Sequence, residues 1–207
     1  MKTAVIIEFS TKIRNKDVEN AVKGIGHEVY NLGMKDIEGE PTLTYIETGF
    51  LSALLLNMKA VDFVVGGCGS GQGYMNMALQ FPGVACGLLL DPVDAFLFSQ
   101  VNAGNCISLA LNKGYGIGGD VNLKFMLEKL FADYFGCGYP PERGEIQRNA
   151  RNRLAKISAD NHKTMPEILN GLDPEIVQNA LTFPGVRDFI EKHAPESELK
   201  KLALSKI

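Results

Sequence analysis

A cysteine, a serine and several closely spaced glycines occur together in residues 64–73, directly after an apolar run. Residues 61–65 predict a buried strand and residues 74–79 are apolar enough to open a helix, so the glycines lie between a strand and a helix. Ligands of α/β proteins bind at such turns. Glycine lets backbone N–H groups approach an anion, and the following helix start adds partial positive charge. The stretch therefore predicts an anion-binding loop with a thiol, Cys68, at its mouth.

The spacing of these residues excludes several familiar loops. A dinucleotide fingerprint fails because Gln72 or Tyr74 stands where its last glycine is needed, and no lysine follows as in a P-loop. A nucleophile elbow would need glycines two residues before and after Ser70, where Cys68 and Gln72 stand. The alternative for Cys68, a small buried side chain beside a tight turn, stays open at this point.

Composition narrows the classes of protein further. The chain has 207 residues, 45% of them hydrophobic, which fits one domain with an appendage. The net charge is -3, and the lysines and arginines form no strongly basic cluster with aromatic residues before the C-terminal third, which argues against nucleic acid as a partner. The four cysteines and three histidines do not stand at metal-ligand spacing, so no metal, cofactor or disulfide framework is expected. Without a signal-peptide pattern or a long apolar run, we expect a cytoplasmic protein that does not enter the membrane.

Apolar runs alternate with helical patterns through the first two thirds of the chain. The expected strands are residues 3–7, 27–32, 61–65, 84–90 and 106–111, and the expected helices include residues 17–25, 46–58 and 94–100 and one capped by Asp120 whose apolar face reaches Tyr134. Short connections between them predict an α/β fold, a Rossmann-like three-layer sandwich with a five-stranded, mostly parallel sheet. The first strand ends at the ligand-binding edge, which makes Phe9 and Ser10 candidate substrate contacts and Glu8 a further polar group.

The last third of the chain changes character after residues 136–141. Arg143, Arg148 and two further arginines crowd a polar helix, either as a solvated face or as groups that capture a phosphate. Short helical patterns with apolar stripes follow. We expect a Rossmann-like domain in residues 1–150 and a helical C-terminal extension in residues 151–207, packed on the core or on a partner subunit.

Residues 68–73, C-G-S-G-Q-G, are similar to the C-G-T-G-x-G loop of ribose-5-phosphate isomerase B and galactose-6-phosphate isomerase. Residues 81–84 then match a second family segment, and Asn102 and Asn105 match the asparagines of its H-N-x-x-N segment. The resemblance to this family spans about residues 1–150. It implies a Rossmann-like enzyme, usually dimeric with sites at the subunit interface, that interconverts aldose and ketose phosphates without metal.

The resemblance also implies roles for the loop. Cys68 as a thiolate would be the base that forms a cis-enediolate, and Ser70, at the family's threonine position, would move a proton between O1 and O2. Negative charge on oxygen would be held by an anion hole built from the backbone of Gly69, Ser70, Gly71, Gln72 and Gly73.

Other roles implied by the family lie outside the loop. Asn102 would hold a sugar hydroxyl, while Arg143 and Arg148 would bind the phosphate. The resemblance further implies a homodimer or a dimer of dimers, and a small-molecule sugar phosphate as the other partner.

The sequence departs from the family at its histidines. Phe9 and Ser10 stand where the first strand usually ends in Asp-His, Val101 replaces the ring-opening histidine, and residues 136–139 replace Gly-Gly-Arg-His. Either the substrate needs no ring opening, as for a tetrose 4-phosphate, or the chain is a non-catalytic binding protein for a phosphorylated sugar or related metabolite. The thiol favours the isomerase, because anion binding alone needs no thiol.

Overall fold

A five-stranded sheet lies at the centre of the computed structural model, which describes all 207 residues. The strands are β1 (Lys2–Ile7), β2 (Glu28–Asn31), β3 (Phe63–Cys68), β4 (Cys86–Leu89) and β5 (Cys106–Ala110), in the order β2-β1-β3-β5-β4. All neighbouring pairs are parallel. Every residue of central β3 is buried, as expected for a strand covered on both faces. The predicted α/β sandwich is confirmed.

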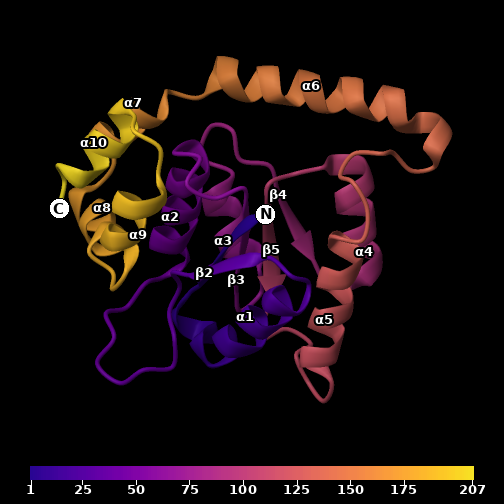
Figure 1. The fold of residues 1–207 in the computed structure, drawn as a ribbon, viewed down its shortest axis with the longest axis horizontal. Coiled ribbons are helices and arrows are strands. Elements are labelled where there is room, and N and C mark those ends of the chain that lie inside the picture. Colours follow the sequence, from indigo (N-terminus) through magenta and orange to yellow (C-terminus); the bar gives the residue numbers. More distant parts are fainter.

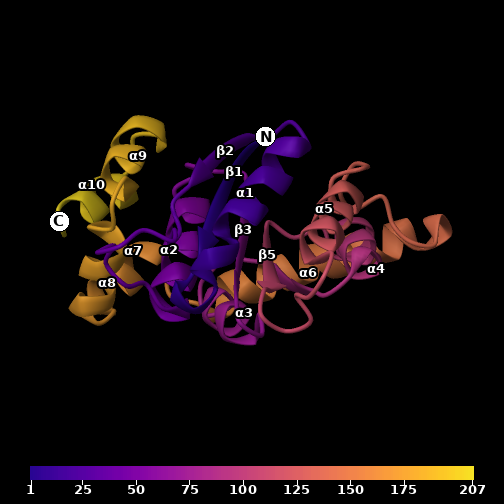
Figure 2. The same ribbon diagram turned by 90° about the horizontal axis from the view of Figure 1, so that it is seen from below.

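Helices cover both faces of this sheet (Figures 1 and 2). One face carries α1 (Asn15–Gly24), α4 (Pro92–Leu97) and α5 (Gly119–Leu130), and the other carries α2 (Tyr45–Asn57) and α3 (Gln72–Ala78). Short helical turns are η1 (Phe9–Arg14), η2 (Phe98–Asn102) and η3 (Pro141–Arg143). None of the helices is both long enough and apolar enough to span a bilayer.

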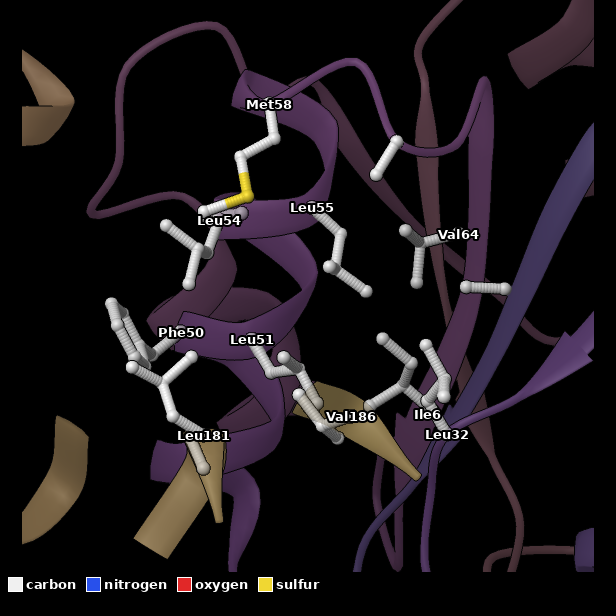
Figure 3. Close-up of a cluster of buried hydrophobic side chains, with 14 of the residues drawn as sticks. Ile6, Leu32, Phe50, Leu51, Leu54, Leu55, Met58, Val64, Leu181 and Val186 are labelled. Atoms are coloured by element: carbon white, nitrogen blue, oxygen red, sulfur yellow. The ribbon is translucent and has the colours of Figure 1, made fainter. Parts of the chain in front are cut away.

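The start of α2 is set by its sequence, and its body is almost wholly buried. The Thr44 hydroxyl accepts a hydrogen bond from the Ile46 N–H, and the Glu47 carboxylate accepts one from the Thr44 N–H at 2.8 Å. Figure 3 shows Leu51 and Leu55 pointing toward the sheet while Phe50 points toward the C-terminal helices. The helix therefore joins two layers of the core.

The C-terminal third consists of helices alone. They are α6 (Gly144–Asn161), α7 (Met165–Gly171), α8 (Pro174–Leu181), α9 (Val186–His193) and α10 (Glu198–Leu204). Helix α8 packs against α2, and all four of the last helices contribute to the same buried cluster, in which Leu181 and Val186 lie with Phe50 (Figure 3). Helix α6 runs across one side of the molecule to reach them (Figure 1). The predicted boundary at residues 150 and 151 falls inside α6, and the division into two domains stays a prediction.

Two details of the predicted helices are wrong. Asp120 does not cap α5, because Gly118, with φ of 77°, turns the chain into the helix and leaves Asp120 inside its first turn. Helix α5 also ends at Leu130, so Tyr134 is 89% exposed rather than buried on its face. An acidic cap is present instead at the start of α4, where Asp91 accepts hydrogen bonds from the Val93 and Asp94 N–H groups.

Candidate active site

Cys68 is the last residue of β3 and stands at the carboxyl edge of the sheet, where it pairs with Ala110 of β5. Its side chain is 6% exposed. Its carbonyl oxygen accepts hydrogen bonds from the Gly71 N–H at 3.2 Å and the Leu111 N–H at 3.1 Å. Gly71 has φ of 76°, a conformation that favours glycine, and α3 begins at the next residue. The predicted strand-to-helix turn therefore exists, with the thiol at its start.

Three residues of the loop leave their N–H groups unpaired within the chain. The N–H groups of Gly69, Ser70 and Gly73 have no acceptor, whereas the Gly71 N–H closes the turn and the Gln72 N–H lies 3.4 Å from the Ser70 hydroxyl. The unpaired donors precede or open α3, at the positively polarised end of its backbone. They are available to negative charge on a ligand.

Helix α3 is anchored beneath the loop by Tyr74. Its side chain is fully buried, and its hydroxyl lies 2.6 Å from the Ser52 hydroxyl and 3.5 Å from Cys106 Sγ. Burial raises the pKa of Tyr74 well above its usual value, so the phenol is neutral. Tyr74 thus fixes the helix that carries the anion-binding turn.

Gly69 is bordered by residues from two other strands. A Cβ on Gly69 would lie 3.4 Å from both the Ser10 hydroxyl and Asn112 Nδ2. The Gly69 carbonyl accepts hydrogen bonds from the Asn112 N–H at 3.0 Å and the Lys113 N–H at 3.1 Å, and Asn112 Nδ2 donates to the Ser10 carbonyl at 3.1 Å. The ends of β1, β3 and β5 are therefore joined around the loop.

Glu8 is hydrogen-bonded to Ser10. Its side chain is 5% exposed, and its carboxylate accepts hydrogen bonds from the Ser10 N–H at 2.9 Å and from the Ser10 hydroxyl. Phe9, between them in sequence, is half exposed, with the Lys12 ammonium 5.6 Å from its ring. Of the residues at this edge, sequence reasoning missed Asn112, although a polar residue directly after a strand was the available signal.

Asn102 and the predicted phosphate-binding arginines lie elsewhere in the chain. Asn102 ends η2, just before β5, and thus stands at the amino edge of the sheet. At about 3.3 Å per residue, the four steps from Cys106 to Ala110 separate this edge from Cys68 by about 13 Å.

Arg143 and Arg148 belong to the same second group as Asn102. They flank the start of α6, which is tied to η2 because Arg151 donates to the Val101 carbonyl at 2.8 Å. Both side chains are exposed, and neither forms an ion pair. Within the chain, the predicted site residues therefore form two groups, one around Cys68 and one around Asn102.

Asn105 has a structural role, as turn chemistry predicts. Its Oδ1 accepts from the Ala85 N–H at 2.9 Å, and its Nδ2 donates to the Gly83 carbonyl at 2.8 Å. These bonds hold the entry to β4 against the entry to β5.

The three histidines occupy structural positions away from the loop. His27 hydrogen-bonds to the Thr3 hydroxyl at 2.9 Å, and its ring meets Phe131 edge-on. His162 hydrogen-bonds within the end of α6, and His193 stacks on Phe189 in the C-terminal helices. No imidazole of the chain therefore borders Cys68. No group of three or more His, Cys, Asp or Glu side chains has the arrangement of a metal site.

Comparison with known proteins relates the chain to sugar isomerases. Residues 9–152 match the family model described as Ribose/Galactose Isomerase. The structure of a 4-deoxy-L-threo-5-hexosulose-uronate ketol-isomerase complexed with a tartrate is 37% identical, with a TM-score of 0.97, over 100% of this chain and 99% of that chain. Ribose-5-phosphate isomerase LacAB_rpiB from Vibrio parahaemolyticus is 39% identical, with a TM-score of 0.95, over 100% of this chain and 99% of that chain.

Other isomerases share only the core fold. Type B ribose 5-phosphate isomerase from Trypanosoma cruzi is 19% identical, with a TM-score of 0.65, over 77% of this chain and 97% of that chain. No curated protein matches the sequence. The two relatives that cover the whole chain thus share the C-terminal helices as well, because the alignments include them.

Proposed function

The chain belongs to the ribose/galactose isomerase family, and from this premise we propose that it is an aldose–ketose isomerase for an anionic sugar, with Cys68 as the base. The observation that carries the proposal is the position of the thiol beside unpaired backbone N–H groups. A protein that only bound an anion would need those donors but no thiol. The family resemblance noted from the sequence is confirmed by the match over residues 9–152.

The proposed reaction passes through a cis-enediolate. Cys68, as a thiolate, removes the proton from C2 of the aldose and returns it to C1 of the ketose. The N–H groups of Gly69, Ser70 and Gly73 stabilise the negative charge that develops on oxygen, while Gly71 holds the turn in shape and Gln72 opens α3. The residues around the loop then bind the reacting end of the sugar: Phe9 and Ser10 from η1, which follows β1, and Asn112, which follows β5.

A second copy of the chain would complete the site. Helix α6 has only Gly144 buried, and Ile146, Leu154 and Ile157 project from it with 65%, 63% and 53% of their surface exposed. Their spacing of eight and three residues places them along one side of a helix. We infer a homodimer in which this stripe is covered and the partner's Asn102, Arg143 and Arg148 approach the loop, so that the arginines bind the anionic group.

A sugar phosphate is the first candidate substrate, because the 39% identical relative is a ribose-5-phosphate isomerase. The absence of histidine from the neighbourhood of Cys68 favours an acyclic form, since no imidazole is available to open a ring. A tetrose 4-phosphate fits this requirement, because its blocked O4 cannot close a furanose.

An open-chain uronate is a second candidate, favoured by the same observation. The 37% identical relative acts on a 4-deoxy-5-hexosulose-uronate, a name that leaves neither an O4 hydroxyl nor a C5 hydroxyl to close a ring on C1. Its carboxylate would take the place of the phosphate at the arginines. The two candidates share an anionic group and an acyclic reacting end.

The test is proton NMR in deuterated buffer with wild type and Cys68→Ala. The panel contains ribose 5-phosphate, tetrose 4-phosphates and open-chain keto-uronates, and both product and loss of the carbon-bound proton signal are followed. The proposal expects turnover or exchange with one class, absent from the variant. A sugar that binds to wild type without product or exchange would make the chain a binding protein instead.

A further inference from the structure

We propose that Ser10, oriented by Glu8, moves the proton between O1 and O2 of the enediolate, an inference that depends on the proposed isomerase function. Base catalysis at carbon is only half of an aldose–ketose isomerisation. The hydroxyl proton must also pass from one oxygen to the other, and this transfer needs a group that can both accept and donate. The Ser10 hydroxyl, which donates a hydrogen bond to the carboxylate of Glu8, meets this need.

Ser10 lies beside Gly69, the residue that follows the thiol of Cys68. Its hydroxyl is 3.4 Å from the point that a Cβ on Gly69 would occupy, and Gly69 follows Cys68 directly. The hydrogen of this hydroxyl is directed to Glu8, so its lone pairs remain free to accept a hydrogen bond from a substrate hydroxyl. Ser10 is thus already polarised as a proton acceptor.

Glu8 is held in place for this role. One carboxylate oxygen accepts the Ser10 N–H at 2.9 Å, and the other accepts the Ser10 hydroxyl, with the Thr11 hydroxyl 3.5 Å away. The side chain is 5% exposed and has no ion-pair partner. Burying a carboxylate is costly. Capping the first turn of η1 uses only one of the two oxygens, so capping alone does not account for the second contact.

Ser70, which the family resemblance assigns to the same transfer, has no comparable partner. Its side chain is exposed, and its hydroxyl accepts only a long hydrogen bond, 3.4 Å, from the Gln72 N–H. No carboxylate or imidazole hydrogen-bonds to it. A hydroxyl without an adjacent base is a weak proton acceptor.

The proposed transfer balances without any further reactant. After Cys68 has taken the C2 proton, negative charge rests on O1 and a double bond joins C1 and C2. The O2 proton passes to Ser10 as the proton of Ser10 passes to Glu8, and the reverse movement delivers a proton to O1. The charge now on O2 forms the C2 carbonyl as Cys68 returns its proton to C1. Ser10 and Glu8 end as they began, with Ser10 as the group that touches substrate and Glu8 as its positioning residue.

The experiment measures how much carbon-bound hydrogen exchanges with deuterated water for each product molecule formed. Without the oxygen-to-oxygen transfer, the enediolate can still be formed by Cys68 but returns to substrate, carrying deuterium. Ser10→Ala and Glu8→Gln are therefore expected to raise the exchange-to-product ratio about tenfold or more while exchange itself continues. Ser10→Thr, which restores a hydroxyl, is expected to bring the ratio back toward the wild-type value.

Ser70→Ala is the matched comparison, because it removes the other hydroxyl at the loop. Whatever its effect on the rate, its exchange-to-product ratio is expected to stay near that of wild type. A ratio that rises in Ser70→Ala and stays unchanged in Ser10→Ala overturns the proposal. If Glu8→Gln does not fold, the Ser10→Ala and Ser10→Thr pair decides alone. Failure of the isomerase proposal would look different, since wild type itself would then give neither product nor exchange.

Discussion

The ring of Tyr74 lies directly against Gly66, with its Cζ 2.0 Å from the position that a Cβ on Gly66 would occupy. The contact joins the first turn of α3 to the central strand, immediately below the loop that begins at Cys68. Even one methyl group on β3 at this point would have to displace the ring of a fully buried tyrosine.

Gly66→Ala is therefore expected to destabilise the fold by about 3 kcal/mol, because overpacking of a closed core forces side chains and backbone to shift. Urea denaturation followed by circular dichroism measures this change. Gly24→Ala is the matched control: a Cβ at Gly24 meets nothing within 4 Å at the end of α1. It is expected to be neutral or to stabilise by about 0.5 kcal/mol. Equal effects of the two variants would contradict the packing argument.

Cys68→Ser is expected to lower turnover and proton exchange by about 10²-fold or more, because the serine hydroxyl is not ionised at neutral pH. The substitution nearly preserves volume, so the melting temperature should change little. Cys137→Ser provides the comparison, since Cys137 is exposed, lies outside the loop, and donates a hydrogen bond from its thiol to the Tyr134 carbonyl. Activity that survives in Cys68→Ser would remove the thiol from the mechanism.

Cys68→Ala and Arg143→Ala are expected to complement one another if the arginine comes from the partner subunit. Each variant alone should be inactive. In a randomly mixed population, half of the dimers are mixed and each has one intact site, so about a quarter of wild-type activity returns. The variants are unfolded together, refolded and assayed. If both variants are inactive dimers and mixing restores nothing, Cys68 and Arg143 of the same subunit serve one site. An Arg143→Ala variant that is active alone would show that Arg143 serves none.

Stability is expected to fall as the pH is lowered from neutral toward 5, with His27 as one cause. Burial holds the pKa of His27 below its ordinary value, so the unfolded chain binds the proton more tightly than the folded one. The stabilisation is fully present above the unfolded pKa, near 6.5, and is lost as the pH falls toward the folded value. Melting temperatures of wild type and His27→Gln at pH 7.5 and 5.0 measure it. The prediction fails if both proteins lose the same number of degrees.

Much of the fold could be predicted because its signals are local. The strand before the loop, predicted at residues 61–65, occurs slightly later, at Phe63–Cys68, and the glycine turn follows it as predicted. The Thr44–Glu47 capping box at the start of α2 is likewise a signal between residues a few positions apart. The cap of α5 was missed for a local reason too, because Gly118 starts the helix without a side-chain oxygen.

The composition of the site was harder to predict, because it depends on strand order. Asn112 reaches Ser10 only because β5 lies beside β3 and β3 beside β1, and no periodicity in the sequence contains that order. Asn102 is a different case: it precedes the strand predicted at residues 106–111, so its place at the amino edge of a parallel sheet, opposite Cys68, was available from the sequence. The spacing of residues in a motif identifies candidate site residues. That spacing alone does not tell at which edge of the sheet they lie, or whether they act in the site of their own chain or of a partner.

Helix α6 has little within its own subunit to keep it helical, since one residue of its 18 is buried. A lone helix of this length is only marginally stable in water. Its order and the assembly of the protein are therefore expected to be a single concentration-dependent event. On strong dilution the sheet and the thiol would persist while α6 unfolded. The protein would therefore lose affinity for the anionic group of the substrate before the rest of the chain unfolded. Specific activity would then depend on protein concentration, with the loss appearing first in KM.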